Sequence, residues 1–308
     1  MTGKAARVDS GSSLERILCA VDLSEFSAPV LAHTTALARR FDAEVTALHV
    51  FAAWVPPPTL ATYPGWMLQI PEARDAIWQE VRALIEPFDD PDLRIALRTA
   101  EGDAATEIIR AAVEIRADMV VVGTHGRSGF DRLALGSVAE KVLRKARCPV
   151  LTLPPGAART TDAAQYRQIM CPTDFHDSSS QAIDFAIWLA LKMEAGLTAL
   201  HVVDAPELEE PPSALAEGLT AVRRQQHAEA ARALHESVAR TQALPIDVRE
   251  LVLAGKPHRE IVRAAIDCHA DIIVMGARGR GPADFDPFGS TANQVVRLAT
   301  CPVITCRS

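Results

Sequence analysis

The sequence predicts an α/β fold built from two tandem, doubly wound, five-stranded parallel sheets. First, the chain has 308 residues, which is enough for two domains that each bury a core. Second, its hydrophobic content is 48 % with only 5 % aromatic residues, a composition that suits helices packed on a parallel sheet. Third, the second half of the chain repeats the first, and each half alternates short apolar strands with amphipathic segments.

Each half begins with a short apolar strand that ends in an aspartate. The segment Arg16–Asp22 (RILCAVD) matches Gln168–Asp174 (QIMCPTD) at an offset of 152. We expect a helix next, over 24–41 and over 178–193, because apolar residues recur there on one face at helical spacing.

The second strand shows the repeat most clearly, since Thr46–Val50 is identical to Thr198–Val202 (TALHV). It is apolar nearly throughout, as expected for a parallel strand covered on both faces. Proline-containing connectors follow in both halves, and they are either a cover for a ligand or exposed, variable loops. We then expect a helix over 72–87 and 219–240, and a third strand over 93–99 and 246–252.

A glycine-rich loop follows the fourth strand in each half. After the runs MVVV and IIVM come Gly123–Ser137 and Gly276–Ser290, and both loops read Gly, two residues, Gly, nine residues, Gly-Ser. Such glycines let backbone amides approach a ligand closely and take dihedral angles that other residues avoid. The Gly-Ser pair then opens a helix, whose unpaired N–H groups and positive dipole end favour an anion such as phosphate. A purely structural strand-to-helix turn is the alternative.

Each half closes with Cys-Pro and a fifth strand, Val150–Leu153 and Val303–Cys306. The predicted organisation is therefore a disordered tail (1–14), a first domain (15–154), a linker (155–166) and a second domain (167–308). The first fifteen residues are small and polar without an apolar core, so they predict neither a signal peptide nor a membrane anchor.

Charge and cysteine usage narrow the class of protein. The net charge of −7 and the pI near 5.7 disfavour a general nucleic-acid binder or an anionic-membrane binder. The six cysteines form no CxxC pair, so we interpret them as free buried thiols in a reducing compartment and expect a cytoplasmic protein. A zinc site that uses Cys268 and His269 finds no support in the spacing.

In a doubly wound sheet, ligands bind outside the carboxyl ends of the strands, where the strand order reverses. The first and fourth strands would flank that point. Asp22 should therefore lie beside the Gly123–Ser137 loop, and Asp174 beside the Gly276–Ser290 loop. A helix N-cap or turn aspartate is the other interpretation of these two residues.

The chain resembles a tandem member of the universal stress protein family, and the resemblance covers Arg16 to Arg307. It is carried by both glycine motifs, by the aspartates after the first strands, by Leu-His-Val after the second strands, and by GSVAEKVLR and CPVL. Members of this family with an intact glycine motif typically bind ATP. The resemblance therefore implies a Rossmann-like fold, an adenine nucleotide as ligand, and two halves that pair internally through their last strands as a pseudo-dimer.

The resemblance also implies which residues hold the nucleotide, with the valines at 50 and 202 at the adenine and the glycines and serines at the ribose and phosphates. In the first half these residues are Ala20, Val21, Asp22, Val50, Gly123, Gly126, Arg127, Gly136, Ser137 and Val138. In the second half they are Pro172, Thr173, Asp174, Val202, Met275, Gly276, Gly279, Arg280, Gly289, Ser290 and Thr291.

The two predicted sites differ in their loops. The first loop carries His125, Arg127 and Arg132 against one acid, Asp131. The second carries Arg278 and Arg280 but also Asp284 and Asp286. Two carboxylates near a triphosphate repel it unless they point away or help to hold Mg²⁺, so the second site depends on their orientation. We interpret His49 and His201 as satisfied core or crevice residues, His125 as a phosphate contact or a solvated loop residue, and Trp54 and Trp66 as adenine covers or loop packing.

The sequence predicts a binding protein more readily than an enzyme. No GxxxxGK[S/T] motif supplies a lysine for the β- and γ-phosphates, and no nucleophile elbow or kinase motif set occurs. We therefore expect a nucleotide-dependent sensor or regulator with an unknown protein partner. Slow ATP hydrolysis, autophosphorylation on a loop serine such as Ser128, and a nucleotide-free stress scaffold stay open as alternatives, as does further association into a homodimer.

Overall fold

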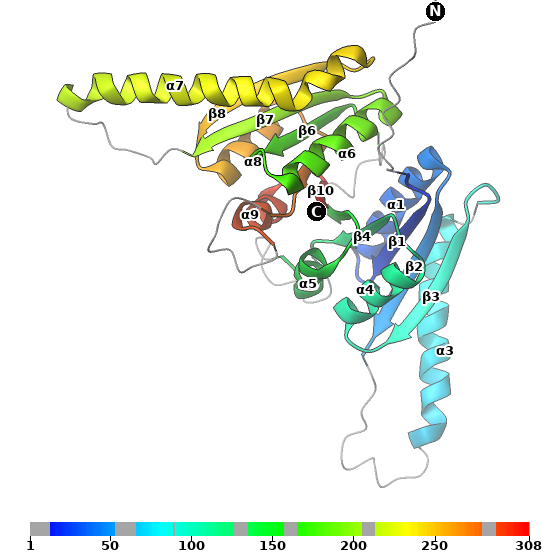
Figure 1. Ribbon diagram of the computed structural model, residues 1–308. Helices are drawn as coiled ribbons and strands as arrows, with labels where there is room; N and C mark the ends of the chain where they lie inside the picture. The colour runs from blue at the N-terminus through cyan, green and yellow to red at the C-terminus, as the bar shows by residue number, and fades with distance from the viewer. Residues whose placement is uncertain are drawn as a thin grey trace, which may run out of the picture. The chain divides into compact units, whose positions relative to one another are not determined.

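The computed structural model describes residues 13–52, 66–88, 90–125, 135–156, 165–204, 213–278 and 288–307; for 66–73 and 213–220 it describes the helix but not the side chains. The chain divides into two compact units, Leu14–Ala164 and Gln165–Ser308. Each unit has its own parallel sheet with helices on both faces (Figure 1).

The first unit alternates strands and helices in the predicted order. Its elements are β1 (Arg16–Val21), α1 (Ser27–Phe41), β2 (Glu44–Phe51), α3 (Trp66–Ile85), the 3-10 turn η1 (Glu86–Phe88), β3 (Ile95–Glu101), α4 (Ala104–Glu114), β4 (Met119–Gly123), α5 (Ser137–Lys145) and β5 (Val150–Leu153).

The second unit repeats this order. Its elements are β6 (Gln168–Thr173), α6 (Asp177–Met193), β7 (Gly196–Asp204), α7 (Ser213–Val238), the 3-10 turn η3 (Ala239–Ala243), β8 (Val248–Gly255), α8 (Pro257–Asp267), β9 (Ile272–Gly276), α9 (Ser290–Leu298) and β10 (Val303–Cys306).

The predicted fold class is confirmed. The strand order is β3-β2-β1-β4-β5 in the first unit and β10-β9-β6-β7-β8 in the second, and each pairing within a unit is parallel. The helices α1 and α3 pack side by side, as do α4 and α5, so that the two pairs cover opposite faces of the first sheet. The strand order reverses between β1 and β4, which is the predicted switch point.

One aspartate in each unit joins the beginnings of the two central strands. The Asp118 carboxylate accepts hydrogen bonds from the backbone N–H groups of Glu15 and Arg16, at 2.9 and 2.8 Å. Asp271 accepts the same pair of bonds from Arg167 and Gln168, at 2.8 and 2.9 Å. Each carboxylate therefore accepts from two amides at the start of the neighbouring strand. The repeat places Asp118 and Asp271 at equivalent positions, in Ala117-Asp118 and Ala270-Asp271, and both have this structural role.

Element boundaries differ from the sequence-based expectations by a few residues. The helix expected from 24 begins at Ser27, because Ser24 and Ser27 first hydrogen-bond to Asp22 in a turn. The helices expected near 72 and 219 begin earlier, at Trp66 and Ser213, and the third strands lie about two residues later than expected. The shifts of α1 and of the third strands follow from turn hydrogen bonds and sheet pairing, which a periodicity pattern does not contain.

The core of each unit consists of aliphatic side chains between its sheet and its helices. Leu18, Leu48 and Val120 are fully buried in the first unit, and Leu200 and Ile273 are fully buried in the second. Leu14 and Tyr166, at the ends of the predicted tail and linker, are also buried, with 4 % and 3 % of their surface exposed. Among the described residues, no helix combines the length and apolarity that a membrane crossing needs.

Candidate functional site

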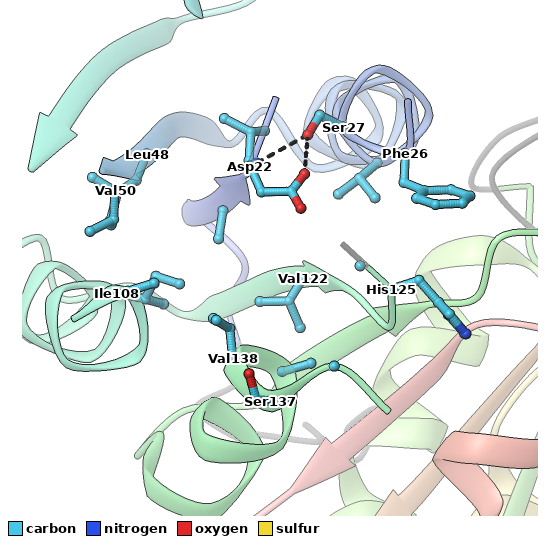
Figure 2. A pocket seen from close by; sticks show the side chains of 17 residues that line it. Asp22, Phe26, Ser27, Leu48, Val50, Ile108, Val122, His125, Ser137 and Val138 are labelled. Atoms are coloured by element: carbon cyan, nitrogen blue, oxygen red, sulfur yellow. Dashed lines mark hydrogen bonds between the residues drawn. The ribbon is translucent and has the colours of Figure 1, made fainter. Parts of the chain in front are cut away.

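The carboxyl ends of β1 and β4 form a crevice in the first unit (Figure 2). Its volume is about 320 Å³, within the range of small-molecule sites. It is lined by Ala20, Val21, Asp22, Phe26, Ser27, Val30, Leu48, Val50, Ala104, Ile108, Val122, Gly123, His125, Gly136, Ser137, Val138 and Ala139.

An equivalent crevice lies at the carboxyl ends of β6 and β9 in the second unit. Its volume is about 520 Å³. It is lined by Pro172, Thr173, Asp174, Ser179, His201, Val202, Val203, Asp204, Gln226, Pro257, Ile261, Met275, Gly276, Arg278, Gly289, Ser290, Thr291 and Ala292.

The structure brings the sequence-predicted residues together wherever it describes them. All eight described candidates of the first half line the first crevice, and all nine of the second half line the second crevice. The other candidates, Gly126, Arg127, Gly279 and Arg280, lie outside the described residues, as do Ser128, Arg132, Asp284 and Asp286. Trp54 and the side chain of Trp66 also lie outside the described part of the chain.

Sequence reasoning missed crevice residues that lie on, or next to, the helices α1, α4 and α7. Phe26 precedes α1, Ile108 lies on α4, and Gln226 lies on α7. None of them belongs to a motif, so the only available signal was the repeat itself, which pairs Ile108 with Ile261.

Asp22 is held in a hydrogen-bonded turn at the edge of the crevice. Its Oδ1 accepts from the backbone N–H of Ser24 at 3.0 Å, from the Ser24 hydroxyl at 2.5 Å and from the Ser27 hydroxyl at 2.8 Å. Asp174 makes the equivalent turn, accepting from the His176 N–H at 3.1 Å and the Ser179 hydroxyl at 2.5 Å. The turn role that we considered for both aspartates is therefore present. Figure 2 shows the Asp22 carboxylate hydrogen-bonded to Ser27.

The residue after each aspartate has an unusual backbone conformation. Leu23 and Phe175 have φ angles of 60° and 66°, a region that bulky residues rarely occupy. Both units keep this conformation at the same place, although glycine would adopt it with less strain. It turns the chain sharply where the strand ends, beside the crevice.

The backbone angles of the loop glycines differ from the sequence-based prediction. Among the described glycines, only Gly102 and Gly255, at the turns into α4 and α8, have a positive φ. At Gly123, Gly136 and Gly276, a larger residue would lack space for its Cβ. A Cβ on Gly123 would lie 3.2 Å from the His125 carbonyl oxygen, and one on Gly136 would lie 3.2 Å from the Thr124 carbonyl oxygen. A Cβ on Gly276 would lie 2.9 Å from Ser178. The prediction of special dihedral angles was wrong at these positions, whereas close backbone approach accounts for the glycines.

The helices α5 and α9 begin at the crevices. Their N-cap residues are Gly136 and Gly289, and neither makes a side-chain capping hydrogen bond to the first turn. The amides of that turn therefore face the crevice without a capping side chain, and the helix dipole adds partial positive charge there. An anionic group is the natural ligand of such a helix start when a crevice leads to it.

The strand histidines have hydrogen-bonded, buried positions. The Nδ1–H of His49 donates to the Val21 carbonyl, and that of His201 donates to the Thr173 carbonyl, both at 2.8 Å. His201 lines the second crevice and stacks on Phe175, with ring centroids 4.4 Å apart. Among the described residues, no group of three or more His, Cys, Asp and Glu side chains could hold a metal ion.

The cysteines are free thiols. Burial raises the pKa of the Cys19 and Cys306 thiols to about 12, and that of Cys148 and Cys301 to about 11. A thiol that stays protonated is a poor nucleophile and a poor metal ligand, so these cysteines are core residues rather than site residues.

The model of the universal stress protein family matches residues 13–154 and 165–307. Universal stress protein Rv2623 of Mycobacterium tuberculosis is 27 % identical over 278 residues, which are 86 % of this chain and 89 % of that protein. A universal stress protein of Mycolicibacterium smegmatis is 27 % identical over 306 residues, covering 94 % and 96 % of the two chains.

A solved structure with the same fold is a universal stress protein from Archaeoglobus fulgidus. It superposes with a TM-score of 0.61 at 22 % identity and covers 95 % of this chain and 98 % of the other. This likeness shows the fold, whereas the family rests on the match of both halves.

Proposed function

We propose that this chain, which belongs to the universal stress protein family, binds an adenine nucleotide in each of its two crevices and acts as a nucleotide-dependent regulator. The observation that carries the proposal is the convergence of distant segments. Residues from the ends of β1, β2 and β4 and from the start of α5 line one crevice, although they are spread over more than a hundred positions of the sequence.

The first crevice has separate places for the three parts of a nucleotide. Leu48, Val50 and Ile108 form an apolar end that suits the flat face of a base (Figure 2). Asp22 lies between the two ends, where its carboxylate can accept hydrogen bonds from ribose hydroxyl groups. The start of α5 supports the proposal with N–H groups for phosphate oxygens.

The second crevice offers the same groups in the same order. Val202 lies near the end of β7, Asp174 follows β6 and α9 begins at Ser290. Its volume of about 520 Å³ is ample for a nucleotide. Any Mg²⁺ would be held mainly by the phosphates and by water, as this ion usually is in nucleotide sites.

Nucleotide content of the freshly purified full chain tests the proposal. We expect up to two adenine nucleotides per chain after denaturation, and calorimetric titration with ATP should refill the stripped protein. The variants Asp22→Asn and Asp174→Asn keep an acceptor oxygen for the turn but remove the charge, so each should weaken one of the two sites. Asp267→Ala, at an exposed position on α8, is the control.

The chemical form of the released nucleotide separates the functional classes. ATP released intact supports a regulator that rarely turns over, whereas mostly ADP would support slow hydrolysis. If no nucleotide is released and titration gives no heat with ATP, ADP or AMP, the proposal is wrong and the crevices are structural.

A further inference from the structure

The two crevices differ at the end that lies beyond the aspartate. In the first, this end is formed by Phe26 and His125, opposite the Leu48–Val50 end (Figure 2). In the second, the repeat places Ser178 and Arg278 at the equivalent positions. Of these two, Arg278 lines the second crevice and the buried Ser178 does not, so the aromatic pair of one unit is replaced by a guanidinium in the other.

The first crevice has no permanent positive charge at this end among its described residues. The His125 and Phe26 rings lie 6.3 Å apart, centroid to centroid. The Thr124 hydroxyl donates to the Leu153 carbonyl at 3.3 Å, which leaves it to accept from the Nδ1–H of His125 at 2.9 Å. His125 Nε2 is buried without a hydrogen-bond partner in the described part of the chain.

The second crevice has a guanidinium at this end, and that group is always charged. The Ser178 hydroxyl donates to the Arg278 carbonyl at 2.8 Å and so fixes the backbone of this residue. The Arg278 side chain is exposed and lines the crevice. Burial, and to a lesser extent the charge of Arg278, lower the pKa of Arg307, so these two cationic groups lie within electrostatic range of each other.

Among the described lining residues, the other charges do not cancel this difference. The loop residues Arg127, Arg132, Arg280, Asp284 and Asp286 lie outside the described part of the chain. Asp22 and Asp174 occupy equivalent positions, so they contribute alike to both crevices. The additional acid of the second crevice, Asp204, lies at the end of β7, and Lys256 Nζ approaches its Oδ1 to 3.8 Å. The second crevice is also the larger, at about 520 Å³ against about 320 Å³.

We infer that the two crevices differ in their preference for phosphate chains: the second uses Arg278 to bind a nucleoside triphosphate in preference to a monophosphate, and this preference is weaker in the first, whose described lining residues include no permanent positive charge. The inference rests on the proposed function, because it assigns ligands to the same two crevices. A chain built in this way responds to the ratio of the two nucleotides. At a given total concentration, the first crevice fills with either nucleotide, whereas the second fills mainly with the triphosphate.

Occlusion of one crevice at a time tests the inference. Val50 and Val202 are equivalent, half-buried residues at the ends of β2 and β7, and a tryptophan at either position fills the local crevice. Val113→Trp, at a position that is 57 % exposed on α4, is the matched control. Calorimetric titration with ATP and with AMP, both in the presence of Mg²⁺, then reports the crevice that stays open.

The expected result is a difference in the ATP-to-AMP affinity ratio. In Val50→Trp only the second crevice stays open, and its affinity for ATP should exceed its affinity for AMP by a factor of about ten or more. One charge-assisted hydrogen bond accounts for a factor of this size. In Val202→Trp, the two affinities should agree within about threefold. Arg278→Gln in the otherwise unchanged chain should reduce the ratio of the second site, Arg278→Lys should largely restore it, and Arg223→Gln on α7 should leave it unchanged.

The outcomes separate failure of the inference from failure of the proposed function. If both crevices bind with the same ATP-to-AMP ratio, or if Arg278→Gln leaves the ratio unchanged, the inference is overturned while nucleotide binding stands. If the unsubstituted chain binds neither nucleotide, both are overturned. Because Arg278 is exposed, its substitution does not depend on the tryptophan variants folding, and this measurement decides the question even if they aggregate.

Discussion

Replacing Gly276 by alanine should destabilise the chain far more than replacing Gly123, although the repeat makes these glycines equivalent. A Cβ on Gly276 would lie 2.9 Å from the Ser178 carbonyl carbon, the Ser178 Oγ and the Ser179 nitrogen. Two of these atoms are backbone atoms of the first turn of α6, so the helix itself must move. A Cβ on Gly123 would meet one carbonyl oxygen at 3.2 Å and one methyl group of Val30 at 3.5 Å.

The magnitudes follow from these distances. Overpacking in a well-packed region costs about 1–3 kcal/mol, and a backbone clash belongs at the upper end of that range. Neither glycine has a positive φ, so alanine also gains about 0.4–1 kcal/mol because it restricts the unfolded chain. We therefore expect a net loss of about 2 kcal/mol for Gly276→Ala and a change close to zero for Gly123→Ala.

Urea unfolding followed by circular dichroism measures these changes, and hydrogen–deuterium exchange with mass spectrometry locates them. Gly156→Ala is the control, since a Cβ there would meet nothing within 4 Å. For Gly276→Ala, the increased exchange should centre on β9 and α6. Equal stability of the two variants, or faster exchange confined to the first unit, would refute the steric argument.

Two further predictions concern positions away from the crevices. Burial lowers the pKa of His33 from 6.5 to about 4, so the unfolded chain binds more protons than the folded chain between these values, and stability falls as the pH falls through this window. The loss between pH 7.5 and pH 5 should be about 2 kcal/mol in urea unfolding, and it should disappear in His33→Leu; an unchanged pH dependence in that variant would assign the effect to other groups. Asp118→Ala and Asp271→Ala each remove the acceptor of two backbone N–H groups and should cost about 1–2 kcal/mol, whereas the asparagine variants keep an acceptor and should cost less. Equal losses in the alanine and asparagine variants would contradict the hydrogen-bond explanation.

Much of the candidate site could be predicted because its signals are local. The aspartate after each first strand and the glycine spacing after each fourth strand are short patterns, and the rule for doubly wound sheets places them together. Val50 and Val202 required the family resemblance, since nothing about a valine at the end of an apolar strand indicates a ligand. Ile108 and Gln226 could not be predicted in either way, because a helix residue lines a crevice only through the packing of its helix on the sheet.

The sequence by itself determined the repeat, the order of strands and helices, and the segments that meet where the strand order reverses. These depend on apolar periodicity and glycine spacing, which are properties of neighbouring residues. Only the tertiary structure decided that Gly123 and Gly276 are needed for space rather than for dihedral angles, since the contacts of an absent Cβ come from segments distant in sequence. It also decided that Phe26 and His125 line one crevice and that Arg278 lines the other. Residues at equivalent places in a repeat can differ in chemistry, and the consequence for a ligand depends on which other side chains the fold places beside them.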